Sequence, residues 1–125
     1  MTQQLIDAKM LSDLAINGLL EKKGQDIVRM DLQHADGAIT DYFVICTGTS
    51  DRHVQSLADS VLVALKKNGE IPFSREGLQT GQWILLDYVN VVVHIFQKDA
   101  RDFYRLESLW GDAECEKINA KNEIA

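Results

Sequence analysis

Proline is nearly absent from this sequence of 125 residues, which contains only one, and no internal repeat or low-complexity segment interrupts it. Hydrophobic residues make up 46% of the chain and charged residues 26%. This balance is typical of a globular protein and excludes a disordered or fibrous chain. The length allows one domain with a single core. We therefore expect a folded domain over residues 1–111 and a polar, frayed C-terminal tail over residues 112–125.

Cysteine and histidine are also scarce, with two and three residues respectively. Cys46 lies in an apolar run and Cys115 in a charged stretch, and neither belongs to a CxxC motif. A disulfide and a zinc site are therefore not expected. The three histidines, His34, His53 and His94, show no HxxxH or HxH spacing, and neither cysteine has a neighbouring base. We expect no metal site, no catalytic residue and no cofactor.

Positive charge is in the minority, because 13 Lys and Arg residues stand against 19 Asp and Glu residues, which gives a formal charge of −6. A surface that neutralises phosphates needs the opposite balance, so direct nucleic-acid specificity is not expected. An acidic chain is instead steered toward basic partners. The sequence also lacks an N-terminal signal segment and any apolar run of about 20 residues, so we expect no membrane partner and a cytoplasmic location.

Apolar residues recur at three- and four-residue steps in two segments, which predicts two amphipathic helices. The first helix covers residues 2–23 and ends at Gly24. The second follows the turn Gly48-Thr49-Ser50, whose side-chain oxygens can cap it, and buries a stripe within residues 54–65. A third helix is expected after Asp99 as its cap, with Arg101 on its solvated face and Phe103, Leu106, Leu109 and Trp110 facing inward.

The remaining apolar segments predict strands. Residues 25–32 alternate apolar and polar side chains, so we expect a half-buried strand with Arg29 facing solvent. The continuous apolar run 42–47 predicts a central strand. Residues 83–88 and 91–96 form a hairpin candidate, preceded by a brief strand at 71–73, and His94 is expected to be a structural histidine. The order of these elements predicts an α/β fold in which helices flank a mixed β-sheet.

One alternative function is a residual nucleotide-binding or nucleotidyltransferase-like enzyme. Gly48-Thr49-Ser50 follows a strand and precedes a helix, where free backbone N–H groups can cradle a phosphate. The P-loop and GxGxxG patterns are nevertheless absent. A nucleotidyltransferase also needs paired carboxylates to hold two metal ions, and Asp87 has no such acidic neighbour. We therefore prefer the interpretation that these three residues form a turn and a cap.

Two long motifs carry a family resemblance. Residues 41–54 read DYFVICTGTSDRHV, and residues 83–110 read WILLDYVNVVVHIFQKDARDFYRLESLW. The Glu76-Gly77 loop and the segment KGQD at 23–26 agree with the same pattern. The sequence resembles the ribosomal silencing factor family, also called the Iojap-related family, from about residue 5 to residue 111.

The resemblance implies a fold related to the nucleotidyltransferases but without their catalytic carboxylates, and therefore a protein that is not an enzyme. Members of the family bind the large ribosomal subunit through large-subunit ribosomal protein fourteen. They block association with the small subunit sterically, which lowers translation when nutrients are limiting. A homodimer of the free protein, formed through the hairpin or the first helix, is a further possibility.

This sequence departs from the family in the hairpin turn, where Val89-Asn90 replaces the usual Gly-Asp. A positive φ at a β-branched residue is costly, so we expect either a different turn type or local strain at Val89. Asn90 keeps a hydrogen-bonding group but loses the charge. If the aspartate of the family meets a basic residue of the partner, its loss lowers affinity by about 1–3 kcal/mol.

The hairpin and the Glu76 loop are the predicted docking surface. We assign Trp83 and Tyr88 as aromatic anchors and Glu76, Asp87 and Asn90 as polar rim contacts, because aromatic residues dominate interface energetics. The competing interpretation is that Trp83 packs in the core. Strand alternation also places Trp83, Leu85 and Asp87 on one face and Ile84, Leu86 and Tyr88 on the other, so the two aromatic rings cannot be equally exposed.

Overall fold

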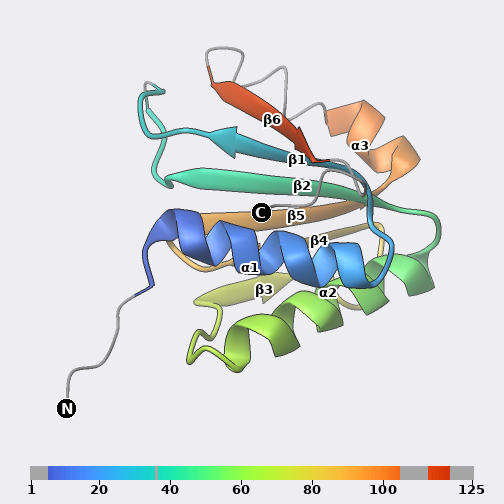
Figure 1. Ribbon diagram of the computed structural model, residues 1–125. Helices are drawn as coiled ribbons and strands as arrows, with labels where there is room; N and C mark the ends of the chain where they lie inside the picture. Colours follow the sequence, from blue (N-terminus) through green and yellow to red (C-terminus); the bar gives the residue numbers. More distant parts are fainter. Residues whose placement is uncertain (1–5, 36, 105–112, 119–125) are drawn as a thin grey trace.

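The computed structural model describes residues 6–35, 37–104 and 113–118. Each helix is followed by one or more strands along the chain, and Figure 1 shows these elements in sequence colours. In chain order they are α1 (Ala8–Glu21), β1 (Gln25–Asp31), β2 (Tyr42–Gly48), α2 (Asp51–Lys66), β3 (Ser74–Glu76), β4 (Trp83–Asp87), β5 (Val91–Gln97), α3 (Lys98–Tyr104) and β6 (Glu114–Ile118).

The strands form a six-stranded sheet in the order β3-β4-β5-β2-β1-β6. The two central strands, β2 and β5, are parallel, with Val44 opposite Val93, and the other neighbours are antiparallel. The predicted α/β class with a mixed sheet flanked by helices is therefore confirmed, as is the central position of β2. The nucleotidyltransferase relationship stays a prediction.

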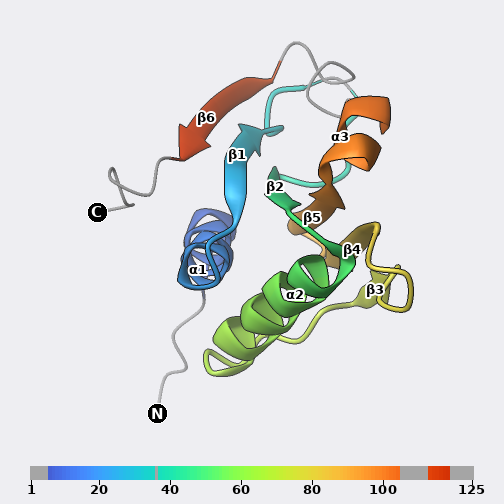
Figure 2. The same cartoon turned by 90° about the vertical axis from the view of Figure 1, so that its right-hand side faces the viewer.

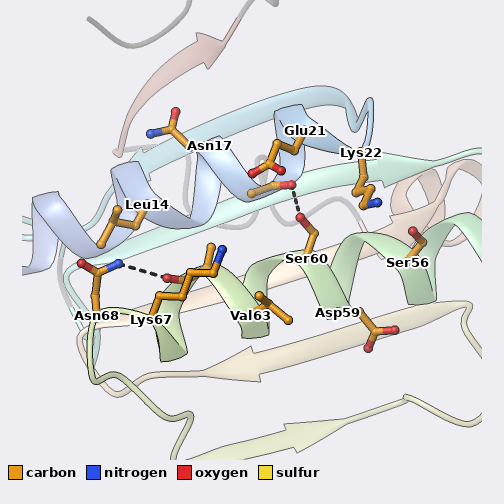
Figure 3. Close-up of a pocket in the computed structure, with 12 residues that line it drawn as sticks. Leu14, Asn17, Glu21, Lys22, Ser56, Asp59, Ser60, Val63, Lys67 and Asn68 are labelled. Atoms are coloured by element: carbon orange, nitrogen blue, oxygen red, sulfur yellow. Dashed lines mark hydrogen bonds between the residues drawn. The ribbon is translucent and has the colours of Figure 1, made fainter.

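Helices α1 and α2 lie side by side on one face of the sheet, whereas α3 lies on the other, as Figure 2 shows. The core under the two long helices contains Leu19, Leu57 and Ile95, all fully buried. The helices approach closely at Gly18, where an added Cβ would lie 3.2 Å from the Ser60 carbonyl oxygen. Ser60 Oγ donates to the Gly18 carbonyl oxygen at 2.7 Å, across the groove that Figure 3 shows.

Local sequence explains how α1 begins and ends. Asp7 caps the N-terminus, because its carboxylate accepts from the Met10 N–H at 2.8 Å. At the other end Lys23 takes the left-handed conformation with φ of 62°, and the Gly24 N–H donates to the Leu19 carbonyl oxygen at 2.8 Å. Gly24 is required for space, since its Cβ would lie 2.6 Å from Cys46 Sγ.

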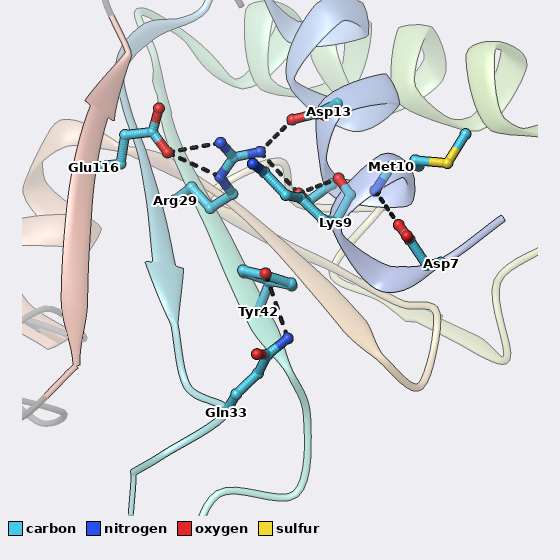
Figure 4. Close-up of polar contacts among 9 residues, drawn as sticks. Asp7, Lys9, Met10, Asp13, Arg29, Gln33, Tyr42 and Glu116 are labelled. Carbon is cyan, nitrogen blue, oxygen red and sulfur yellow. Dashed lines mark hydrogen bonds and ion pairs between the residues drawn. The ribbon is translucent and has the colours of Figure 1, made fainter.

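The structure corrects two predictions at the end of the chain and beside β1. The predicted frayed tail contains strand β6, which pairs with β1 along Glu114–Ile118. Arg29, predicted to face solvent, is only 6% exposed because it lies between α1 and β6. Its guanidinium pairs with Asp13 of α1 and, at 2.6 Å, with Glu116 of β6, as Figure 4 shows.

Two further elements differ from prediction. Strand β3 occupies Ser74–Glu76 rather than residues 71–73, although the Phe73 N–H already donates to the Asp87 carbonyl oxygen at 2.6 Å. Helix α3 begins at Lys98, so Asp99 lies inside its first turn and is not its cap. Arg101, predicted on a solvated face, donates to the Asp26 carbonyl oxygen at 2.6 Å and to Thr47 Oγ1 at 2.7 Å. The side chain of Phe103 and all of Leu106, Leu109 and Trp110 lie outside the described residues.

The face of the sheet opposite α1 and α2 has a smaller core. Val28, Met30, Leu32, Ile45 and Phe96 are buried there, with Ala100 of α3 and the segment after β1 packed against them. In the described ranges, no helix is long and apolar enough to cross a membrane. The described residues likewise contain no cluster of three His, Cys, Asp or Glu side chains that could hold a metal ion.

Candidate functional site

No helix among the residues that the structure describes lies over part of this second face, and we call that part the open face. It spans β2, β4 and β5, where register places Phe43 opposite Val92, Val92 opposite Asp87 and Leu85 opposite His94. Half-buried side chains surround the buried His94 on this surface: Phe43, Trp83, Leu85, Asp87 and Val92. Large side chains that are only half covered on the face of a sheet are suited to contact another protein.

Trp83 is held in place on the open face. Its indole Nε1 donates to His94 Nδ1 at 3.2 Å, and its ring stacks on Phe96 with centroids 5.0 Å apart. The side chain is half buried, so it belongs partly to the local core and partly to the surface. A ring fixed in this way loses little conformational entropy when a partner covers it.

His94 packs against the rings of Trp83 and Phe43 and is only 4% exposed. Burial lowers the pKa of its imidazole to about 4, so the ring is neutral near pH 7. Because Nδ1 accepts the indole N–H, the single proton of the neutral ring resides on Nε2. The Phe43 ring meets it edge-on with centroids 4.7 Å apart. These contacts bear out the expected structural histidine, and they make the open face a rigid aromatic surface.

Tyr88 does not belong to the open face, and this corrects its assignment as an exposed anchor. Its ring is 7% exposed and packs with Leu86 in the core under α1 and α2. Burial raises the pKa of its phenol to about 12. The alternation of Ile84, Leu86 and Tyr88 against Trp83, Leu85 and Asp87 is confirmed, and it explains why only one of the two aromatic residues reaches the surface.

Glu76 and Trp83 are brought together by the loop between β3 and β4. Glu76 is exposed at the end of β3 and pairs with Leu85. The next residue, Gly77, has φ of 80°, and a Cβ there would lie 1.9 Å from the Trp83 carbonyl oxygen. Only glycine satisfies both conditions. The Glu76-Gly77 pair therefore fixes an acidic side chain beside the start of the strand that carries Trp83.

The hairpin turn carries the strain expected of Val89-Asn90. Val89 has φ of 75°, and the Asn90 N–H donates to the Tyr88 carbonyl oxygen at 2.9 Å, which makes a tight three-residue turn. Such a conformation costs a β-branched residue about 1–3 kcal/mol. Asp87 supports the turn by accepting the Val89 N–H at 2.7 Å. The Asn90 carbonyl oxygen accepts the N–H groups of Asp41 and Tyr42, so Asn90 also anchors β2.

Sequence reasoning missed the residues that complete the open face, namely Phe43, Val92 and the neighbouring Ile39. Ile39 is 97% exposed, although it is a large apolar residue. The alternation along 42–47 and 91–96 contained the signal for Phe43 and Val92. This signal did not predict exposure, because a continuous apolar run indicates a strand that is covered on both faces. Whether a described helix covers a given face depends on tertiary packing.

The elements of the nucleotide-binding alternative lie apart. Gly48 pairs with Gln97 at one end of the sheet, whereas Asp87 pairs with Val92 near the other. The turn is also self-capped, because the Thr49 N–H donates to His53 Nδ1 at 2.9 Å and the His53 N–H donates to Ser50 Oγ at 3.0 Å. Donors used in this way do not offer a phosphate cradle.

The chain is similar to proteins of known family in both sequence and structure. A family model described as "Ribosomal silencing factor during starvation" matches residues 6–125. A Haemophilus influenzae ribosomal silencing factor is 47% identical over 88 residues, which are 70% of this chain and 85% of the relative. A crystal structure of a Chromobacterium violaceum protein is similar, with a TM-score of 0.81 and 38% identity over 85% of this chain and 88% of that one.

A more distant mouse protein, named mitochondrial assembly of ribosomal large subunit protein 1, is 31% identical over 84% of this chain and 47% of its own length. The bacterial relatives are named for silencing ribosomes, which is regulation rather than catalysis, and this confirms the prediction that the protein is not an enzyme. Together the family model and these relatives place the chain in the ribosomal silencing factor family of translation regulators.

Proposed function

We propose that this protein binds the large ribosomal subunit through ribosomal protein fourteen and keeps the small subunit from joining, which lowers translation under nutrient limitation. Family membership supports a ribosomal partner, and the name of the mouse relative refers to the large subunit. The observation that carries the proposal is the open face, a rigid apolar surface that no described helix covers.

The docking surface we propose has Trp83, Leu85 and Phe43 at its centre. Their half-buried side chains are held by the sheet, so a partner that covers them removes apolar area from water at little entropic cost. Glu76 and Asp87 supply acidic groups at the edge. These carboxylates, together with the net charge of −6, suit a basic protein better than the phosphates of RNA.

Steric exclusion requires no reaction. A folded domain of 14.1 kDa bound beside the subunit interface occupies space that the small subunit must enter. Silencing then depends on occupancy, so it rises with protein concentration and saturates when every large subunit is bound. The proposal includes no substrate, no turnover and no cofactor.

Co-sedimentation with isolated large subunits, small subunits and joined ribosomes tests the proposal. We expect selective binding to large subunits, and Trp83→Ala should weaken it by about 2 kcal/mol, or roughly thirtyfold, as loss of a central aromatic anchor does. Val63→Ala is the matched control, because Val63 is exposed on α2, which covers the opposite face of the sheet.

Circular dichroism must show that Trp83→Ala remains folded, since the indole also packs on Phe96. A folded Trp83→Ala variant that binds like the wild type would remove the open face as the docking surface. Wild-type protein that fails to bind large subunits would overturn the proposed function itself.

A further inference from the structure

A pocket of about 370 Å³ lies beside the open face and shares side chains with it. We call it the side pocket. Its walls are mostly apolar, and the side chains used in the argument below are Leu32, Thr40, Phe43, Leu85, Val92 and His94. These residues come from β2, β4, β5 and the segment between β1 and β2, so the pocket depends on the folded sheet.

Two residues that line the side pocket each carry a buried polar atom with no hydrogen-bond partner among the described residues. These atoms are Thr40 Oγ1 and His94 Nε2, and the third such atom in the described chain, the Tyr88 hydroxyl, lies on the opposite face of the sheet. Buried polar groups in folded proteins are nearly always paired, so an unpaired group requires an explanation. Two such atoms on residues that line one pocket make the pocket a candidate binding site.

The chemistry of these atoms defines what fits. His94 Nε2 carries the ring proton, because Nδ1 accepts the Trp83 indole N–H, so it can only donate. The Thr40 hydroxyl can donate or accept. The Asp87 carboxylate at the rim disfavours an anion. The apolar walls favour a ring or short hydrocarbon, and the donors favour one oxygen acceptor on it.

We propose that the side pocket is a binding site for a small, uncharged, mainly apolar molecule that carries one oxygen acceptor, such as a phenol. The oxygen accepts the His94 Nε2–H and pairs with the Thr40 hydroxyl, while the hydrocarbon part packs on Leu85 and Val92. Both polar atoms are shielded from water in the free protein. Binding therefore requires a small shift of the pocket wall that brings the oxygen within reach of these two atoms.

Occupancy of the side pocket also has a regulatory consequence, which rests on the proposed function. Phe43 and Leu85 belong both to the pocket and to the centre of the open face. A molecule bound against them changes the surface that the ribosomal partner must cover. The bound ligand and the large subunit should therefore compete, and each lowers the affinity for the other by the same factor.

Titration with p-cresol and with toluene tests the binding site without ribosomes. The two probes have the same ring and methyl group, and only p-cresol carries the oxygen. We expect p-cresol to shift the His94 ring signals in NMR spectra and to raise the melting temperature of the folded protein, with toluene binding about tenfold more weakly. Equal binding of the two probes, or no binding of p-cresol, would overturn the proposal.

Variants identify the donor. His94→Phe keeps an aromatic ring but removes Nε2–H, so p-cresol should bind about tenfold more weakly while toluene binds as before. Thr40→Val provides a second test if His94→Phe fails to fold. Tyr88→Phe is the matched control, because it removes the third unpaired polar atom on the opposite face and should leave p-cresol binding unchanged.

Competition is measured last, by co-sedimentation with large subunits at saturating p-cresol. Release of the wild type but not of His94→Phe supports the regulatory role, and full retention of the wild type overturns it. If the protein fails to bind large subunits even without p-cresol, the proposed function fails, whereas the titration result for the side pocket stands unaffected.

Discussion

The two faces of the central sheet are both apolar, but the helices that the structure describes seal only one of them. Under α1 and α2 the side chains are buried completely, as Leu86 and Val93 are. On the open face, Leu85 and Trp83 are half buried around His94. Neighbouring residues of one strand therefore differ in environment: those on the covered face hold the fold together, and those on the open face form the docking surface that we propose.

Leu85 and Leu86 provide the sharpest test of this comparison and the largest expected effect. Leu86 is fully buried, so Leu86→Ala leaves a cavity and should lower the free energy of unfolding by about 2–5 kcal/mol. Leu85→Ala should cost less than half as much, because its side chain is only partly removed from water in the folded state. Urea unfolding of both variants measures the difference.

The affinity for the large ribosomal subunit should rank the two variants in the opposite order from their stability. Under conditions where both variants are folded, Leu85→Ala should weaken large-subunit binding and Leu86→Ala should leave it unchanged. A Leu86→Ala variant that is as stable as Leu85→Ala would break the distinction between a sealed face and an open one.

Acid should affect the open face through His94. The folded protein keeps this ring neutral down to about pH 4, whereas the unfolded chain protonates it near its ordinary pKa of 6.5. Below pH 6.5 the unfolded state therefore binds more protons than the folded state. As the pH is lowered from 6.5 to 4, the free energy of unfolding should decrease by about 3 kcal/mol. Asp87 is the carboxylate that shares the side pocket with this ring.

Urea unfolding between pH 7 and pH 4.5 checks the prediction. His94→Phe should lose much less stability than the wild type over this range, while His34→Gln, at an exposed position, should behave like the wild type. Equal losses in the wild type and His94→Phe would show that other groups cause the acid sensitivity.

The turn that joins β4 and β5 should give the smallest effect. Val89→Gly removes the Cβ at φ of 75° and relieves the strained turn. The gain is partly offset by the greater flexibility of glycine in the unfolded chain, so the free energy of unfolding should rise by about 1 kcal/mol. Val89→Ala, which keeps a Cβ, should stabilise less. Equal melting temperatures for Val89→Ala and Val89→Gly would show that the turn is not strained by the Cβ atom.

Local patterns predicted much of the fold. The helical stripes located α1 and α2, and the apolar run of residues 42–47 identified β2 as central. Alternation also separated Trp83 from Tyr88. These features depend on side-chain spacing within one element, which the sequence contains directly. The positive φ at Val89 was foreseen for the same reason, because turn chemistry is local.

Features that depend on distant partners were not predictable in this way. Strand β6 has a charged sequence without apolar alternation, and it is placed by pairing with β1 and by the contact of Glu116 with Arg29. Arg29 was expected in solvent because its two partners lie far away along the chain. Tyr88 was assigned as an anchor because the sequence does not tell which face the helices cover.

The Arg29 pairs have a consequence for how the protein folds during its own synthesis. Asp13 lies in the first helix, and Glu116 is 87 residues beyond Arg29, in the last strand. The guanidinium therefore keeps an incomplete set of partners until the segment that carries Glu116 has left the ribosome. Contacts of such long sequence separation form late and slow the approach to the native state. A regulator of ribosomes thus completes this contact only after the strand that carries Glu116 has emerged from the ribosome that makes it.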